Sequence, residues 1–228
     1  PYRIKPFEDI VIDPKDTIVF DQQINKQLRK KAAELGADGK LLRNSSGEII
    51  RTNFTEKVLV SLLTKLYNFV PEAGIWMNTQ RPEWNDANNA LVGNGASMVT
   101  LYYLRRSLTF WINLLQNSDI KDSMISEEVL SLLEAMEETF KSYTEKLTGK
   151  FSNRERFEFA QELGLAGSEY RKKIYDNTFS GNRKAMETEK MIEFFKLTLK
   201  YLDHSIDRNK REDGLYHAYN LISFNDNQ

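Results

Sequence analysis

The sequence predicts an all-α fold, a single helical domain over residues 1–228 that ends in a short C-terminal strand or loop. Two observations predict it. Apolar residues recur at the three- and four-residue spacing of amphipathic helices in most segments after residue 20. Residue types that start and stop helices bound those segments. Together these patterns predict roughly six helices.

The N-terminal part combines an irregular entry with one helix. Residues 1–20 mix prolines, acids and short β-branched runs, which favours irregular backbone with a short strand. A helix is expected over 21–36, because Asp21 is a suitable N-cap and Gly36 a suitable stop. Residues 37–53 are rich in Gly, Asn and Ser and indicate a loop or a small hairpin.

Two strongly apolar helices follow. The first is predicted over 54–70, with a cap at Asn53 or Thr55 and an end imposed by Pro71. The second covers 97–116 and is apolar on most of its faces, so we expect it to be buried on most sides.

A long connection, residues 71–95, separates these two helices. Connections of this length without regular structure are uncommon in compact domains and tend to carry function. The sequence therefore predicts a functional loop over this range.

The next two predicted helices differ in their patterns. Residues 126–147 carry a single apolar stripe, with Ser126 as the expected cap, which is typical of an outer, half-exposed helix. Residues 153–177 also have helical spacing, although Gly164 and Gly167 favour a break or kink within them.

The C-terminal part contains the last long helix, expected over 183–209. After it, an Asp-Gly turn precedes a run of aromatic and β-branched residues that predicts a loop and a short strand.

The composition excludes several classes of protein. Hydrophobic residues make up 40% and charged residues 29% of the chain, and the net charge is −1. This balance favours neither nucleic acid nor a membrane as a partner, and no apolar run approaches the roughly 20 residues of a membrane span. The lack of cysteine excludes disulfides and thiolate chemistry without fixing the compartment, for which we expect the cytoplasm.

The chain begins at Pro1 and has no signal-like N-terminal segment. We therefore expect either a processed precursor or a part of a larger polypeptide. In the second case the remainder of that polypeptide is a partner of this chain.

The stretch "NTQRPEWNDANNALVGNGAS", residues 78–97, contains the main candidate site. An indole beside carboxylates and amides suits a sugar, because the indole packs on the ring while the polar groups bond its hydroxyls. The glycines allow close backbone approach, and the helix that starts near Ser97 offers N–H groups to an anion such as phosphate. The alternative interpretation is structural: acids and Asn residues cap the helix, and the Trp fills the core.

The run "EWND" followed by "ANNALVGNG" and an apolar helix resembles cellobiose-phosphorylase-like enzymes of the (α/α)6 six-hairpin glycosidase group. The resemblance covers about twenty residues and implies antiparallel helical hairpins that form part of a larger toroidal catalytic domain. It implies Asp86 as the general acid and Trp84 as the wall of a sugar subsite. The family has Asp where this chain has Glu83, and Gly where it has Ala87.

Further residues complete the predicted site. We expect Glu83 to assist catalysis, and a second carboxylate, needed for inverting hydrolysis, to come from a loop. The predicted substrate-binding residues are Trp84, Asn85, Asn88, Asn89, Tyr216 and His217. The candidates for the second carboxylate are the loop acids Glu72, Glu83, Glu212 and Asp213.

Neither a metal nor a cofactor is expected. The two histidines, His204 and His217, do not have metal-ligand spacing, and the acids show no calcium-loop pattern. The sequence also lacks a Gly-rich nucleotide-phosphate loop.

The leading hypothesis is a carbohydrate-active enzyme domain that cleaves a glycosidic bond by hydrolysis or phosphorolysis, with Asp86 as the general acid. The alternatives are a non-catalytic glycan-binding module, or a structural helical module in which the motif only caps a helix.

Overall fold

Short antiparallel strands accompany the helices, so the prediction of an all-α fold was wrong: the computed structural model is mixed α/β. It describes residues 1–44, 46–79 and 90–224. The strands are two to five residues long, and β5–β8 and β6–β7 pair segments that are far apart in the chain. Such short strands contain too few residues for a two-residue alternation to be visible in the sequence.

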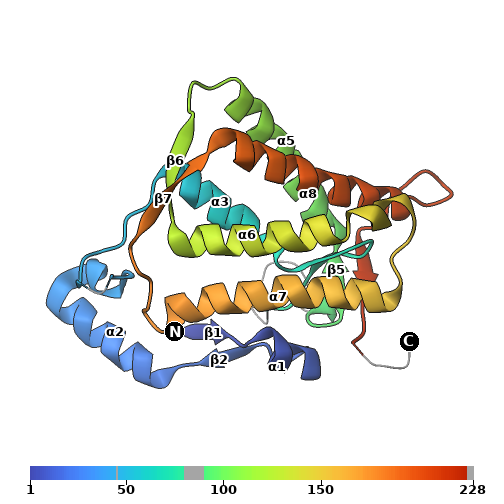
Figure 1. Ribbon diagram of the computed structural model, residues 1–228. Coiled ribbons are helices and arrows are strands. Elements are labelled where there is room, and N and C mark those ends of the chain that lie inside the picture. The colour runs from blue at the N-terminus through green and yellow to red at the C-terminus, as the bar shows by residue number, and fades with distance from the viewer. Residues whose placement is uncertain (45, 80–89, 225–228) are drawn as a thin grey trace.

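The helices and strands keep the labels of Figure 1. The helices are α1 (Phe7–Ile12), α2 (Gln22–Leu35), α3 (Phe54–Leu66), α5 (Met98–Gln116), α6 (Glu127–Ser142), α7 (Asn153–Tyr175) and α8 (Thr188–Arg208), with 3-10 helices η1 (Gly36–Lys40) and η2 (Thr144–Thr148). The strands are β1 (Tyr2–Ile4), β2 (Ile18–Phe20), β3 (Phe69–Val70), β4 (Gly74–Trp76), β5 (Gly95–Ser97), β6 (Asp122–Ser126), β7 (Arg183–Glu187) and β8 (Tyr219–Leu221).

The long helices pack in an order that differs from a series of sequential hairpins. Helix α5 packs mainly on α8, α6 packs on α7, and α3 contacts α6 (Figure 1). The expected arrangement of antiparallel hairpins as part of a toroid is therefore also corrected, because α5 has a partner from the C-terminal part of the chain. An aromatic core joins the layers: the ring centroids of Phe140 and Tyr201 are 4.9 Å apart, and those of Phe140 and Phe159 are 5.3 Å apart.

Two sheets lie at opposite ends of the long helices (Figure 1). At one end β6 pairs with β7, from Asp122 opposite Glu187 to Ser126 opposite Arg183. The predicted helix over 183–209 therefore starts five residues late, at Thr188, because its first residues form β7. At the other end β3, β4, β5 and β8 form one antiparallel sheet in that order.

Several predicted helix ends are confirmed by their capping bonds. The Asp21 carboxylate accepts from Ile24 N at 2.8 Å, and Gly36 ends α2 with φ of 69°. The Asn53 side chain accepts from Glu56 N at 2.8 Å, and Ser97 Oγ accepts from Thr100 N at 3.0 Å. These bonds satisfy N–H groups that a helix leaves free in its first turn.

The expected side-chain cap at Ser126 does not form, although α6 does begin at Glu127. The Ser126 hydroxyl instead donates to Oε1 of the buried Glu56 at 2.6 Å, and Arg183 Nη2 lies 3.2 Å from the other carboxylate oxygen. This cluster joins the start of α3 to both strands of the β6–β7 sheet.

Two expectations, one about the burial of α5 and one about a kink in α7, were wrong. Helix α5 buries one stripe of residues, while Tyr103 is 68% and Phe110 57% exposed, so it is not buried on most sides. Helix α7 runs unbroken through Gly164 and Gly167. A Cβ at Gly164 would collide with the Phe7 ring, so these glycines allow close packing instead of a kink.

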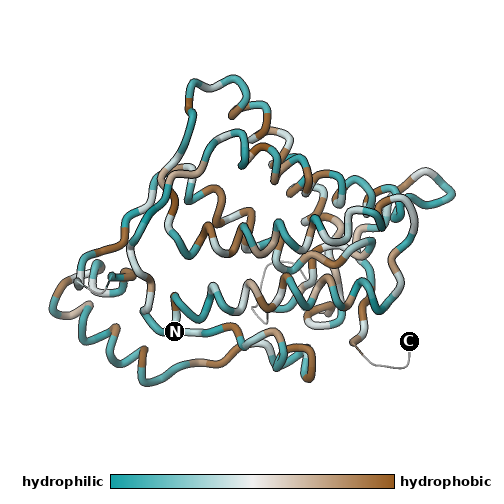
Figure 2. The backbone as a smooth tube through the Cα atoms, in the orientation of Figure 1, coloured by the Kyte–Doolittle hydropathy of each residue, from teal (hydrophilic) through white to brown (hydrophobic). Residues whose placement is uncertain are grey.

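The hydropathy of the helices follows this packing. Figure 2 shows α2 as largely teal, in agreement with the absence of buried residues among those of α2.

Within the described ranges, no helix combines the length and apolar character that a membrane span requires.

Candidate functional site

A polar hollow of about 120 Å³ lies where α3 ends and α5 begins. Thr79 and Val92, which lie on either side of the predicted motif in the sequence, both line it. Its full lining consists of Lys65, Asn68, Ile75, Trp76, Met77, Asn78, Thr79, Val92, Ser97 and Thr100. Amides and hydroxyls supply most of its polar groups, and these both donate and accept hydrogen bonds.

Two amide side chains are fixed against each other in the wall of the hollow. Asn78 Nδ2 donates to Asn68 Oδ1 at 2.7 Å, and Asn68 Nδ2 donates to Thr64 O at 3.3 Å. Asn78 is only 7% exposed. A buried amide that is held by such a bond has a defined orientation, and Asn78 Oδ1 accepts from the Thr79 hydroxyl at 3.5 Å.

The main chain on both sides of the motif is held in place. Gly93 N donates to Met77 O at 2.6 Å, and Met77 N donates to Gly95 O at 2.9 Å. The indole of Trp76 donates to Gly93 O at 2.8 Å. A Cβ on Gly93 would collide with Pro14 O, so the close backbone approach that the sequence suggested for a ligand is used here for packing.

The N-terminus of α5 borders the hollow but has no free N–H groups for an anion. Met98 N and Val99 N both donate to Ala218 O, at 2.9 and 3.3 Å, and Thr100 N donates to Ser97 Oγ. The backbone N–H groups at the start of α5, which were predicted to bind a phosphate, therefore donate to acceptors within the protein.

Lys65 supplies a positive charge to the hollow, and it is the single charged residue among the described lining. Its ammonium makes no ion pair with any carboxylate in residues 1–44, 46–79 or 90–224. An unpaired cation at the rim favours a ligand with an acidic group or a developing negative charge.

Six of the predicted site residues lie outside the described residues: Asp86, Glu83, Trp84, Asn85, Asn88 and Asn89. The described chain meets this stretch at Thr79 on one side and Ala90 on the other.

Tyr216 and His217 lie elsewhere on the surface. Tyr216 is 45% exposed, and its ring centroid is 6.2 Å from that of Tyr102. His217 is exposed; its N–H donates to Asn209 O at 3.1 Å and its O accepts from Tyr102 OH at 2.8 Å. Neither residue is part of the lining of the polar hollow.

Among the loop acids, Glu72 is at the centre of a buried polar cluster. Its side chain is 6% exposed, its Oε1 is 3.0 Å from His204 Nε2, and its Oε2 accepts a bond from Arg156 Nη2. Phe151 N donates to Oε1 at 3.2 Å, and Arg208 Nε lies 3.7 Å from the same oxygen. The main chain of Glu72 is also part of this cluster, because Glu72 N donates to the Ser205 hydroxyl at 3.0 Å.

The charge of Glu72 is held by these contacts. Burial alone would raise the pKa of its carboxyl, but the hydrogen bonds from Arg156, His204 and Phe151 outweigh burial and lower it. Both oxygens are occupied, so the group is neither a proton donor at neutral pH nor free to activate a water. It acts as an anchor for the turn between β3 and β4.

The other two loop acids are exposed. Asp213 lies 2.8 Å from Arg211 Nη2 and accepts from Leu215 N at 3.1 Å, which closes the turn before β8. Glu212 is exposed on the same turn. Among the described residues no carboxylate lines the polar hollow, so no second catalytic acid is identified there.

Sequence reasoning did not find Lys65, Asn68 and Thr79 as lining residues, nor the role of Asn78. Asn78 opens the quoted stretch, but its partner Asn68 follows the end of α3, where polar residues are common. No sequence pattern indicates that the two amides meet.

Comparison with known proteins adds no assignment: no protein-family model and no curated sequence matches the chain. Within the described residues, no three of the His, Asp and Glu side chains come together in a way that would hold a metal ion.

Proposed function

We propose that this chain belongs to a carbohydrate-active protein that binds a saccharide at the polar hollow and cleaves its glycosidic bond. One observation carries the proposal: Thr79 and Val92, which flank the "EWND" motif in the sequence, both line a hollow with fixed amides and hydroxyls. Saccharides are recognised by such groups, because each sugar hydroxyl both donates and accepts.

The chemistry follows from the residue types. Asp86 is the proposed general acid, which protonates the oxygen of the leaving sugar, and Trp84 is the proposed platform for a sugar ring. The nucleophile is water in a hydrolase and inorganic phosphate in a phosphorylase. The unpaired ammonium of Lys65 is suited to the phosphate.

The test measures turnover and binding separately. The full chain is incubated with a panel of disaccharides, with and without inorganic phosphate, and free sugar and sugar phosphate are measured. We expect Asp86→Asn to reduce turnover at least about 100-fold while the saccharide affinity stays within a factor of about two. The exposed Asp119 gives the matched control, and Asp119→Asn should leave both quantities unchanged. Undiminished turnover in Asp86→Asn would refute the role of this acid.

A second candidate function is glycan binding without catalysis. It is favoured by the lack of a carboxylate among the described lining residues of the hollow, since hydrolysis with inversion requires a second carboxylate. Saccharide binding by the unaltered chain, with no product in either buffer, would support this candidate over the first.

A further inference from the structure

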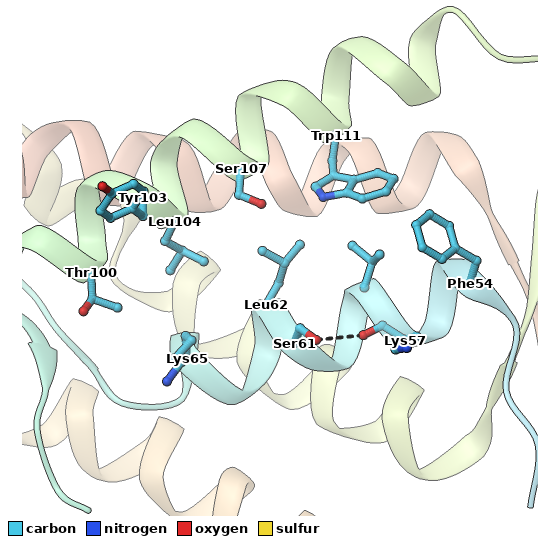
Figure 3. Close-up of a pocket in the computed structure, with 11 residues that line it drawn as sticks. Phe54, Lys57, Ser61, Leu62, Lys65, Thr100, Tyr103, Leu104, Ser107 and Trp111 are labelled. Carbon is cyan, nitrogen blue, oxygen red and sulfur yellow. Dashed lines mark hydrogen bonds between the residues drawn. The ribbon is translucent and has the colours of Figure 1, made fainter. Parts of the chain in front are cut away.

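A second, larger cavity of about 470 Å³ forms an open trough between α3 and α5. Figure 3 shows Leu62 from α3 and Leu104 and Ser107 from α5 pointing into the space between the two helices. Trp111 and Phe54 stand at one end and Tyr103 at the other. The floor is apolar: Leu62 and Leu104 are each 5% exposed.

The two ends of the trough expose large aromatic surfaces to solvent. Phe54 is 70% and Tyr103 is 68% exposed, and the Phe54 and Trp111 ring centroids are 5.8 Å apart. Tyr103, Ser107 and Trp111 follow one another at four-residue spacing, so they line one face of α5 over about 12 Å. Exposed apolar patches of this kind mark interaction sites on soluble proteins.

The trough is also locally basic. Lys57 and Lys65 line its α3 side, and no Asp or Glu is among its lining residues. Neither lysine is ion-paired within the described part of the chain. The chain as a whole has a net charge of −1, so this basic edge is a local property of the trough.

The described lining of the trough includes no side-chain amide, in contrast to the polar hollow. The Ser61 hydroxyl donates to Lys57 O at 2.9 Å, and the Thr100 hydroxyl donates to Oγ of Ser97, the cap of α5, at 3.0 Å. A sugar requires many directed polar contacts, whereas the apolar stripe of a helix requires a smooth apolar floor. Helices dock in such grooves through residues spaced three and four apart.

We propose that the trough docks an amphipathic α-helix of a polypeptide partner, with acidic residues along the edge of that helix that faces Lys57 and Lys65. From Phe54 to Lys65 the trough runs about 16 Å, the length of three helical turns. Docking of two identical troughs on each other would bring their unpaired lysines together, so a second copy of this chain is the poorer occupant.

The test uses a displayed library of helical peptides about 14 residues long, or roughly four turns. Each carries a Leu stripe at helical spacing, and each flanking position is Glu, Lys or Ser. The library is selected against the full chain. We expect Glu to be enriched at the flanks of the bound peptides.

Variants then locate the binding. For a selected peptide, Trp111→Ala and Lys57→Glu should each weaken affinity at least about tenfold, and Lys57→Glu should shift the flank preference towards Lys. Lys26→Glu, on the exposed face of α2, is the matched control and should change affinity less than twofold. Circular dichroism and thermal melting verify that each variant is folded.

Three results would overturn the proposal. The first is a selection that gives no binders or no Glu enrichment. The second is binding that does not respond to Trp111→Ala. The third is a different occupant, shown by a dimer in sedimentation that Trp111→Ala abolishes, or by neutral oligosaccharides that displace the selected peptide.

Discussion

His204 Nε2 lies 3.0 Å from Oε1 of Glu72, a residue 132 positions earlier in the chain. The contact joins α8 to the turn between β3 and β4. Phe151 N and Arg156 bring the start of α7 to the same carboxylate. Because β4 leads directly to Met77 and Asn78, this cluster fixes the strand from which the polar hollow is built.

The lowered pKa of Glu72 makes its contribution to stability dependent on pH. A carboxyl whose pKa is lower in the folded state stabilises fully above its ordinary value of 4.5, and this contribution is lost as pH falls through the folded pKa. We expect Glu72→Gln to lower the free energy of unfolding at pH 7, and its difference from the unaltered chain to narrow as pH drops below 4.5. Urea unfolding of both proteins between pH 7 and pH values below 4.5 measures this difference in the free energy of unfolding. A difference that is constant with pH would contradict a lowered pKa of Glu72.

The backbone of Glu72 provides a second prediction. Its φ is 62°, which is unfavourable for a residue other than Gly, and it follows Pro71 in a turn closed by a 3.1 Å bond from Ala73 N to Val70 O. Glycine would relieve this strain but would remove the carboxylate from Arg156 and His204. We expect Glu72→Gly to destabilise the chain by about 2–4 kcal/mol, since stranding buried charge costs more than the strain.

Asn177 gives the matched control for that substitution. Its φ is 54°, and none of its side-chain atoms makes a hydrogen bond that holds it there. Asn177→Gly should therefore be neutral or stabilising by up to about 1 kcal/mol. Equal effects of the two substitutions in denaturant unfolding would show that the Glu72 cluster contributes nothing to stability.

The sequence predicts most helices, several caps and the short strands within residues 1–20 and 219–221, but not how the strands pair into sheets. Asp21, Asn53 and Ser97 are short-range signals, since each caps an N–H group three residues away. The pairing of β6 with β7 joins segments about sixty residues apart, and no local pattern encodes it. For the same reason, the sequence predicts Ser126 as a side-chain cap, whereas its hydroxyl donates to Glu56.

The functional role of residues 71–95 stays a prediction. The described part of this connection contains β4 and the start of β5, which its composition did not predict, and its residues Thr79 and Val92 border the polar hollow. The partners in that hollow come from other elements: Asn68 follows α3, and Thr100 belongs to α5. Contacts of this kind depend on how α3, β4 and α5 meet, which residue spacing within one element does not determine.

The amide pair in the hollow gives a prediction for the proposed saccharide site. Removal of the Asn78 amide leaves Asn68 Oδ1 without its 2.7 Å donor and takes away one polar group from the wall. We expect Asn78→Ala to weaken saccharide affinity by about tenfold, the effect of one buried hydrogen bond. Calorimetric titration with the saccharide measures this affinity. The exposed Asn113 is the matched control, and a loss of affinity in Asn113→Ala as large as in Asn78→Ala would argue against a role for the pair.

Two glycines with similar positive φ separate strain from packing. Gly93 has φ of 84° and Gly36 has φ of 69°, so an alanine is strained at both. At Gly36 a Cβ meets nothing within 4 Å, whereas at Gly93 it collides with Pro14 O. Gly36 has φ of 69° and ψ of −156°, a region nearly restricted to glycine, so we expect Gly36→Ala to cost about 1–3 kcal/mol. We expect Gly93→Ala to cost clearly more. The collision would also displace Gly93 O, which accepts a hydrogen bond from Trp76 Nε1 at 2.8 Å. The fluorescence of Trp76 should therefore shift in Gly93→Ala and not in Gly36→Ala. Equal free energies of unfolding in the two variants would refute the close approach of Gly93 to Pro14.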